Sequence, residues 1–423
     1  MKKRNKNISI FSEISAVASV YFAMTYVLII IPNVLAGIGV SYNAAFLAVC
    51  LSSAFGCFMC AVFAKKPFVF APYIGENSFL AFSAVMIMGY SYKEALGCAF
   101  WAAVVMLIIS LTDIKKYVID NIPVCIRSAL PVSIGLFLTI LGLLEMGIVQ
   151  ISSKSLMLKL GALNSPQVLM GMLCLLIIIV LRALNVRLNV LFGIATTLLI
   201  AAFNGSIHIP TFSMPEFSNV FLHLDMKGTF SLSHLTLIIT FFVFLLNDMT
   251  AVSVSALESG KKKDATDYQG TALATSISSC VAPIFGCVSS GVYMESMLAE
   301  ECGAKTKFVP VTLGILFLLS IFLIPFLSII PNYICAAVLV YMGILLTSEI
   351  EYKGFSAEEF SDYVPAFLLV VLTCFTVNLA VGICTAFISY IILKVCTGRF
   401  SDINIASVIF AILSVVFFAF YPY

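Results

Sequence analysis

GCVSSGVYMES, Gly286 to Ser296, is built unlike a uniform membrane-spanning helix. Glycine and serine lower helix propensity, and the two glycines let the backbone unwind. The stretch nevertheless lies in a strongly apolar chain and carries a carboxylate, Glu295. A charge at membrane depth costs about 2.5 to 3.5 kcal/mol on insertion scales. A segment of this kind is typical of a broken helix that lines a polar cavity inside the protein.

A second stretch of the same character is PFVFAPYIGENSFLAF, Pro67 to Phe82. Extended, proline-bracketed residues lead into Gly75, Glu76 and Asn77, and an apolar helical pattern follows from Phe79. Two broken spans, one in each half of a membrane chain, indicate a substrate site near the bilayer midplane between structural repeats. The sequence therefore predicts a transporter.

The composition excludes most other classes of protein. Of the 423 residues 61% are hydrophobic and 10% are charged, which is typical of a polytopic membrane protein without a soluble domain. No HExxH, GxSxG or Walker sequence occurs, so nothing supports protease, esterase or ATPase chemistry, and we expect neither an enzyme nor a cofactor or metal. The cysteines lie mostly in apolar runs, which predicts buried thiols rather than disulfides.

We expect an all-α polytopic membrane protein with fourteen transmembrane segments. Residues 1–203 form the first seven-span repeat, residues 204–232 an extracytoplasmic connecting loop, and residues 233–396 the second repeat. An odd number of spans in each half inverts the second repeat relative to the first. It also places the two broken spans, the third and the tenth, in corresponding positions. The apolar segment 397–423 is either an additional span or an interfacial helix.

The distribution of charge predicts the orientation. With a cytoplasmic N-terminus, nineteen Lys and Arg residues fall in inside loops and four fall outside. This excess is the positive-inside bias of multi-pass proteins, and we expect the chain in the cell (plasma) membrane. The basic runs are topology signals in this interpretation, and we expect no nucleic acid as a partner.

Three acids inside the spans are candidates for chemistry, namely Asp248, Glu295 and Glu76. Intramembrane acids face the bundle interior by default and mark substrate or proton paths. A carboxylate in a cavity accepts hydrogen bonds from N–H donors when it is ionised, and it can also carry a proton. Two such acids with an amide, Asn77, between them suit a planar, neutral heterocycle with alternating donors and acceptors.

At these residues the sequence resembles the nucleobase:cation symporter-2 family, in its adenine/guanine/hypoxanthine permease (AzgA-like) branch. APYIGENSFL, Ala71 to Leu80, is similar to the third-span motif APGMGLNAYF, and GCVSSGVYMES is similar to the tenth-span motif GTSTVTTYVES. IGLFLTILGL, Ile134 to Leu143, resembles the fifth-span sequence IGLFIAFIGL. FAMTYVLIIIPNVL in the first span and GICTAFISYIILK in the last extend the likeness over most of the chain.

The resemblance implies a seven-plus-seven inverted repeat, with a core of spans 1–4 and 8–11 and a gate of spans 5–7 and 12–14. It implies import of purine nucleobases such as hypoxanthine, guanine or adenine by proton symport, through movement of the core against the gate. The candidate proton-coupling residues are the three acids inside the spans, Asp248, Glu295 and Glu76. The implied substrate-binding residues are Asn77, Asp248, Glu295, Tyr293, Met294 and, as a weaker apolar candidate, Phe79.

The sequence departs from the family pattern in three places. The family's eighth-span motif, FVDLFDT, has two acids. The corresponding stretch of this chain, LLNDMTA, keeps one acid and has Ala251 at the position of the second. The ninth span has Thr275 where an acid is usual, and Glu76 stands where the family has leucine. These changes affect the identity of the purine and the proton stoichiometry more than the fold.

Two alternatives stay open beside the purine importer. One is an anion carrier of the sulfate or bicarbonate type with the same fold, although two carboxylates would repel an anion. The other is a membrane receptor that binds its ligand without transporting it. The expected partners are a purine nucleobase, the proton and the lipid bilayer, and a homodimer remains open.

Overall fold

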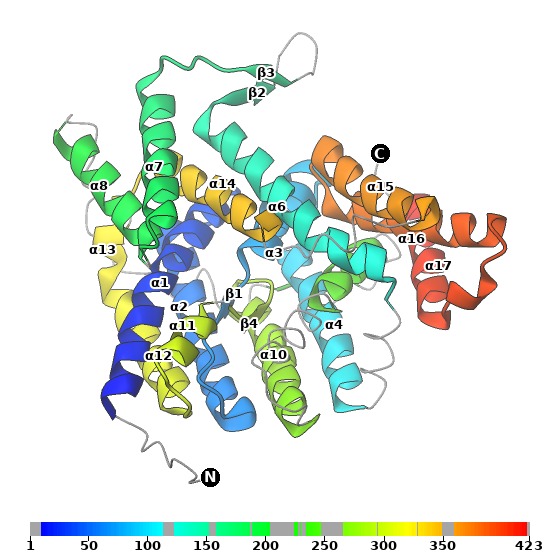
Figure 1. Cartoon of the computed structure of the whole chain (residues 1–423), viewed down its shortest axis with the longest axis horizontal. Coiled ribbons are helices and arrows are strands. Elements are labelled where there is room, and N and C mark those ends of the chain that lie inside the picture. The colour runs from blue at the N-terminus through cyan, green and yellow to red at the C-terminus, as the bar shows by residue number, and fades with distance from the viewer. Residues whose placement is uncertain are drawn as a thin grey trace.

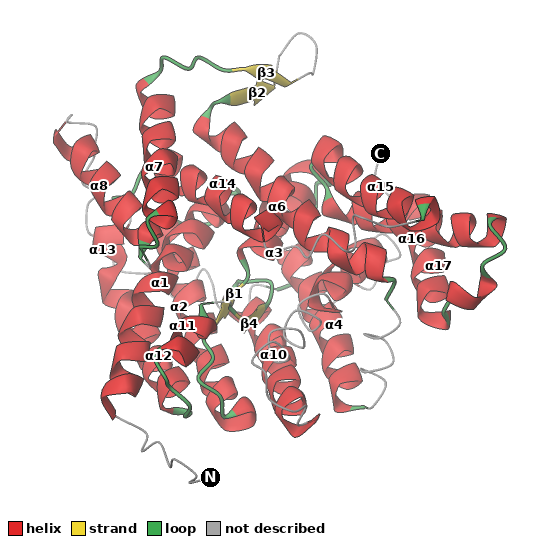
Figure 2. Ribbon diagram, viewed as in Figure 1, coloured by secondary structure: helices red, strands yellow, loops and turns green. Residues whose placement is uncertain are grey.

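The computed structural model describes residues 10–112, 122–151, 158–186, 188–203, 224–226, 229, 234–246, 265–293, 295–327, 329–348 and 359–420. These residues are mostly helical, as Figure 2 shows. The helices are α1 (Ile10–Ala36), α2 (Tyr42–Met59), α3 (Ile74–Ser78), α4 (Tyr92–Leu111), α6 (Val124–Met146), α7 (Pro166–Ala183), α8 (Asn189–Phe203), His234–Leu246, α10 (Ala265–Phe285), α11 (Ser296–Glu301), α12 (Phe308–Leu319), α13 (Ile324–Leu327), α14 (Asn332–Ser348), α15 (Phe360–Thr376), α16 (Leu379–Cys396) and α17 (Ile405–Phe420). Short helices of other pitch are η1 (Cys60–Ala64), η2 (Phe79–Ile87), η5 (Ser320–Leu323) and η7 (Phe400–Asp402).

Six of the described helices are at least 18 residues long and apolar enough to cross a membrane: α1, α2 continued through η1, α4, α6, α7 and α16. Shorter apolar helices of 10–17 residues accompany them. Several begin at capping residues that end the preceding loop. Ser91 and Glu94 form a reciprocal capping box at the start of α4, and Ser165 caps α7 just before Pro166. The fold is therefore that of a multi-pass helical membrane protein.

The described helices pack as two groups. In the first group α10 lies against α2 and α4, and α12 lies against α1 and α2. In the second group α14 lies against α6 and α7, and α15 lies against α6 and α16. Figure 1 shows α6, α14 and α15 together on one side of the two short central strands, with α4 and α10 on the other. Contacts of α1 with α8 and α14, and of α3 with α6, join the groups.

Glycines bring α6 and α14 close together in the second group. A Cβ atom at Gly343 would lie 2.4 Å from the Gly135 carbonyl oxygen and 2.1 Å from Thr139 Oγ1. A Cβ atom at Gly142 would lie 2.7 Å from the Ala336 carbonyl oxygen. Because backbone cannot move aside as a long side chain can, only glycine fits at these contacts. Small residues at such crossings are the usual means of close helix packing in membranes.

We expect Gly343→Val to force α6 and α14 apart and to destabilise the protein by about 1–3 kcal/mol, the usual cost of overpacking. The measurement is the apparent melting temperature of the detergent-solubilised protein, followed by the loss of its monodisperse chromatographic peak. Ile344→Val is the matched control, since Ile344 is the next residue on α14 and 42% exposed. Equal melting temperatures for the two variants would contradict the close contact.

The two broken spans predicted from the sequence are confirmed, and they meet each other. Strand β1 (Phe70–Pro72) pairs antiparallel with β4 (Ser290–Val292), in a register that aligns Ala71 with Gly291. Each strand is followed by a short helix, α3 after β1 and α11 after β4. A second pair, β2 (Val149–Ile151) with β3 (Leu158–Leu160), follows α6 at the edge of the molecule (Figure 2). The sequence does not predict that hairpin.

The prediction of buried, unpaired thiols is also confirmed. All thirteen cysteines lie in described residues as free thiols, and ten of them are buried. Cys57 bonds through its sulfur to the backbone of Phe70, at 3.4 Å in both directions. Cys60 donates to the carbonyl oxygens of Phe68 and Lys66. These thiols serve to attach α2 and η1 to the segment before and within β1.

The apolar C-terminal segment forms a helix, α17, of 16 residues. At 1.5 Å per residue it is about 24 Å long, shorter than the hydrocarbon core of a typical bilayer. Its Phe410 ring stacks on Phe387 of α16 at 4.9 Å and on Phe242 of the His234–Leu246 helix at 6.3 Å. The segment after residue 396 therefore packs against the bundle through an aromatic contact with two different helices.

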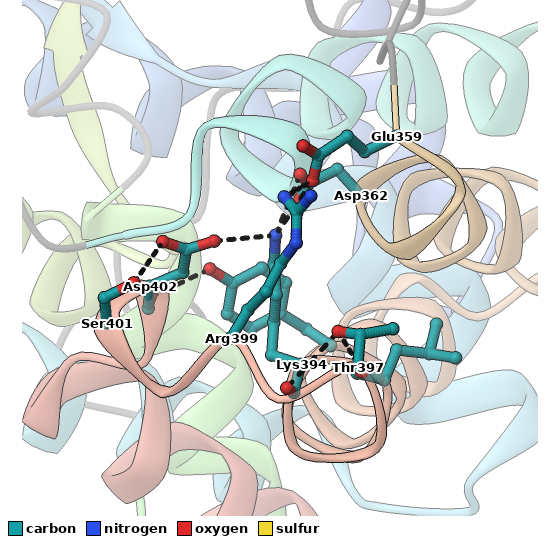
Figure 3. Close-up of polar contacts among 9 residues, drawn as sticks. Glu359, Asp362, Lys394, Thr397, Arg399, Ser401 and Asp402 are labelled. Atoms are coloured by element: carbon teal, nitrogen blue, oxygen red, sulfur yellow. Dashed lines mark hydrogen bonds and ion pairs between the residues drawn. The ribbon is translucent and has the colours of Figure 1, made fainter.

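A cluster of charges holds the ends of α15 and α16 to the start of the C-terminal segment (Figure 3). Lys394 in the last turn of α16 is 2% exposed and donates to Asp362 Oδ2 at 3.0 Å and to Asp402 Oδ2 at 3.1 Å. Arg399 pairs with Glu359 at the start of α15. Because a buried lysine needs paired carboxylates, the cluster is expected to be required for stability.

Hydrogen bonding to Lys394 holds the pKa of Asp402 below its usual range. A depressed pKa adds stability above the unfolded value, and that stability is lost as the pH falls through the folded value. Since free aspartate titrates near pH 3.9, the contribution fades in acid below about pH 4. We therefore expect Asp402→Asn to lower the melting temperature at pH 6 and to make less difference at about pH 3.5. An equal difference at both pH values would contradict the pairing.

Candidate functional site

The antiparallel pair of β1 and β4, which we call the crossing of the two broken spans, forms the centre of the candidate site. Backbone groups in a membrane interior need internal hydrogen-bond partners, and irregular backbone occurs there only inside protein or beside a cavity. Here the two strands bond to each other, and Tyr293 N donates to the Val69 carbonyl oxygen at 3.1 Å. Gly56 of α2 passes so close that a Cβ atom there would lie 2.9 Å from Phe70 Cβ. The crossing is thus packed tightly on its α2 side.

Asn77 joins the two broken spans directly. Its Nδ2 donates to the Tyr73 carbonyl oxygen at 2.7 Å, and its Oδ1 accepts from Val288 N at 3.2 Å. The side chain is 1% exposed. One amide therefore bonds both to its own short helix and to the residue two positions before β4. Its orientation is fixed by these contacts, as a residue that orients a ligand requires.

Two tyrosines stack across the crossing. The rings of Tyr73 and Tyr293 lie 5.5 Å apart with an interplanar angle of 16°. The Tyr293 hydroxyl donates to the Pro72 carbonyl oxygen at 2.5 Å, and the Tyr73 hydroxyl donates to the Val292 carbonyl oxygen at 3.2 Å. Gly291 allows this approach, since a Cβ atom there would lie 2.3 Å from the Tyr73 hydroxyl oxygen. Each broken span therefore contributes an aromatic ring that is fixed by the other.

Glu295 stands directly before α11, at its N-cap position. It is partly buried, and its Oε1 accepts a hydrogen bond from the Tyr26 hydroxyl of α1 at 2.6 Å. The next residue, Ser296, accepts from Val69 N through its hydroxyl at 3.0 Å. The carboxylate is thus connected to α1, and the residue beside it is connected to the segment before β1.

Phe79 and Glu76 lie on the other broken span. Phe79 is fully buried and packs edge-on against Phe241 at 5.6 Å and Phe244 at 5.2 Å. It therefore contacts the His234–Leu246 helix rather than an open space. Glu76, in the first turn of α3, is 4% exposed.

Three predicted positions lie outside the described residues: Asp248, Met294 and Ala251. The described part of the eighth span ends at Leu246. Thr275, where the family pattern has an acid, lies in α10 and is 1% exposed. Its hydroxyl has no hydrogen-bond partner among the described residues.

A cavity of about 40 Å³ lies between the two helix groups, at the far end of α1 from Glu13. Since one water needs about 10–15 Å³ measured this way, it has room for about three waters. Its polar lining includes Asn33 of α1, Glu145 of α6 and Asn332 of α14. Asn33 is two helical turns from Tyr26 on the same face of α1, so about 10 Å separates this cavity from Glu295 along the helix.

The profile of the permease family matches residues 11–382 of the chain. The chain belongs to that family, the nucleobase:cation symporter-2 family. It is 31% identical to the adenine permease AdeP of Escherichia coli K12, over 97% of this chain and 93% of AdeP. It is 30% identical to the guanine/hypoxanthine permease PbuO of Bacillus subtilis 168, over 97% of each chain. The resemblance inferred from the sequence motifs is thus confirmed, and permeases of this family are transporters.

Two solved structures of transporters share this fold. The transmembrane domain of a cyanobacterial bicarbonate transporter, BicA, aligns with a TM-score of 0.64 at 16% identity, over 89% of this chain and 99% of that domain. Murine Slc26a9, an anion transporter in the inward-facing state, aligns with a TM-score of 0.63 at 12% identity, over 94% of this chain and 70% of that one. At such identities the likeness establishes the fold alone.

The structure adds two residues that the sequence did not single out, Tyr73, which stacks on Tyr293, and Tyr26, which bonds to Glu295. Tyr26 lies within FAMTYVLIIIPNVL, the first-span stretch that is similar to the family. Nothing in its spacing distinguishes it from other aromatic residues of the spans. Its polar hydroxyl at the centre of an apolar helix was the available signal, because a buried tyrosine hydroxyl usually has a hydrogen-bond partner.

We expect Asn77→Ala to reduce ligand affinity strongly, because it removes the amide that fixes Tyr73 and leaves Val288 N without its acceptor. A buried donor without a partner costs about 1–3 kcal/mol, which also lowers stability. The measurements are equilibrium binding of radiolabelled base and melting temperature. Ser78→Ala is the matched control, since Ser78 is the next residue, is buried, and its hydroxyl has no bond within the described residues. If both variants bound as the native chain does, Asn77 would have no part in the site.

Proposed function

We propose that the chain is a secondary active transporter that imports purine nucleobases together with protons. The observation that carries this proposal is the position of Glu295 beside the crossing of the two broken spans, with the fixed amide of Asn77 on the same crossing. A carboxylate binds ring N–H groups, and an amide offers both a donor and an acceptor. Permeases for adenine and for guanine or hypoxanthine, similar to this chain over nearly its full length, support purines as the substrate class.

In this mechanism Glu295 and Asp248 hold the ring N–H groups and Asn77 sets the orientation of the base. The stacked rings of Tyr73 and Tyr293 and the backbone next to Met294 form the adjoining wall, with Phe79 behind them. Protonation of an acid at the site couples transport to the proton gradient, for which Glu295, Asp248 and Glu76 are the candidates. Each of these groups lies on the broken spans or on the eighth span, and in this proposal those spans move together with the substrate.

The proposed conformational change is a movement of one helix group against the other. The first group, with α1, α2, α4, α10 and α12, corresponds to the core, and the second, with α6, α7, α14, α15 and α16, corresponds to the gate. Few contacts cross between them, and the cavity at Asn33 and Glu145 lies in that boundary. Alternating access then opens this boundary first on one side of the membrane and then on the other.

The anion-carrier alternative takes support from the fold shared with bicarbonate and other anion transporters. The carboxylate of Glu295 at the crossing argues against it, because an anion beside an ionised carboxylate is repelled. A receptor without transport has the same site and differs in one observable: it binds the base without accumulating it.

The test is uptake of radiolabelled hypoxanthine, guanine, adenine, xanthine and uracil by cells that lack their own carriers, with and without a protonophore. We expect protonophore-sensitive uptake of at least one purine by the native chain. Glu295→Gln should reduce it at least tenfold, since the carboxylate that accepts the ring N–H groups in this proposal is gone.

Glu300→Gln is the matched control, because Glu300 lies on the same short helix, α11, and is exposed. Uptake in that variant should equal the native rate. Uptake of bicarbonate or sulfate in place of any base would favour the anion carrier. Binding of a purine without accumulation would favour the receptor.

A further inference from the structure

We propose that Tyr26 is a positioning residue of the binding site: its hydroxyl holds Oε1 of Glu295, so that Oε2 is the oxygen that receives both the purine and the coupled proton. The part of this inference that concerns the purine rests on the proposed function. The part that concerns the proton rests on the geometry alone. It gives a role to a residue of α1, a helix that none of the predicted site residues occupies.

The contact between the two side chains is short. Tyr26 is 3% exposed, and its hydroxyl donates to Glu295 Oε1 at 2.6 Å. This distance lies in the range of 2.5–2.7 Å that is usual for a hydroxyl donating to a charged oxygen. The two residues are 269 positions apart in the chain, and the packing of α1 against α11 brings them together.

The direction of the bond fixes the roles of the two carboxyl oxygens. A tyrosine hydroxyl has a single proton, and here it points at Oε1. When Glu295 takes up a proton, an oxygen that already accepts from Tyr26 keeps that bond best by remaining the carbonyl oxygen. The incoming proton therefore resides on Oε2. The same oxygen accepts a ring N–H when it is ionised and donates to a ring nitrogen or carbonyl when it is protonated.

Both states keep the bond to Tyr26, so the carboxyl group does not rotate as it gains or loses its proton. A fixed carboxyl plane presents one oxygen to the base in one direction. Without the hydroxyl, the group can rotate and exchange its two oxygens, which costs conformational entropy on binding. The loss should therefore appear in affinity more than in the rate of the transport step.

α1 also supplies a matched control. Tyr21 lies on the same helix, and its hydroxyl bonds to Ser320 Oγ at 2.7 Å. Tyr21→Phe removes a tyrosine hydroxyl and one hydrogen bond, as Tyr26→Phe does, but leaves the carboxylate untouched. A merely structural effect of losing a hydroxyl from α1 would be shared by the two variants.

The first experiment needs no substrate. Infrared difference spectra of the purified protein in lipid, taken between acid and neutral pH, contain the C=O stretching band of protonated Glu295, identified as the band missing in Glu295→Gln. Because a hydrogen bond to a carbonyl oxygen lowers its stretching frequency, we expect this band to move to higher frequency in Tyr26→Phe and to stay in place in Tyr21→Phe. An unmoved band in Tyr26→Phe would overturn the assignment of Oε1 as the accepting oxygen.

The second experiment measures initial uptake rates for the base that the native chain transports. Tyr26→Phe should raise KM about tenfold, the equivalent of one hydrogen bond to a charged group, and change Vmax less than twofold. Tyr21→Phe should leave both constants within twofold of the native values. An equal rise of KM in both variants, or a fall in Vmax alone, would overturn the positioning role.

The two experiments separate the two proposals. If the native chain takes up no base, the proposed function fails, and the infrared band still decides the role of Tyr26. If uptake is found and the band does not move, the function stands and Tyr26 has no such role. Chromatographic and melting profiles of each variant confirm that a folded protein is compared.

Discussion

Two strands of three residues each, paired with one another inside the membrane, are the constraint on which the rest of the site depends. Their backbone groups are not satisfied by a helix, and the bilayer interior offers no water. Each broken span therefore requires the other. The pairing brings residues more than 200 positions apart to one place, and each strand is followed by a short helix, α3 or α11. Asn77 and Glu295 belong to those helices or stand directly before one, so their positions follow from the pairing.

Around this pairing, polar side chains complete the bonding that the short strands leave unfinished. Asn77 bonds across to Val288, the two tyrosines exchange hydroxyl bonds with backbone carbonyls, and Ser296 accepts from Val69. Each of these bonds joins one broken span to the other. Asn77, held by one such bond and by a second bond to the Tyr73 carbonyl oxygen, has little freedom left, and a ligand that meets it loses less entropy on binding. The polar residues that complete the fold thus also pre-organise the site.

The sequence predicted the helical class, the two broken spans, the buried thiols and the family, because composition and local motifs carry that information. It also placed Asn77 and Glu295 on the broken spans. It did not predict that the broken spans would pair, nor the bond from Tyr26 to Glu295. Both are contacts between distant segments, and residue spacing says nothing about which helix faces which. The pairing of the buried Lys394 with Asp362 and Asp402 is a similar contact, which residue spacing does not indicate.

The C-terminal helix has a consequence for motion. Phe410 stacks on Phe387 of α16, which belongs to the second helix group, and on Phe242 of the His234–Leu246 helix, which packs on the broken span through Phe79. A ring of this size cannot keep both partners if the two helices slide past each other by more than a few ångströms. One of the two stacks then has to separate. This costs about 0.5–1.5 kcal/mol in addition to the free energy of exposing the apolar area of the rings. The packing of α17 would therefore oppose any such sliding. Removal of α17 would ease the motion without changing the candidate site.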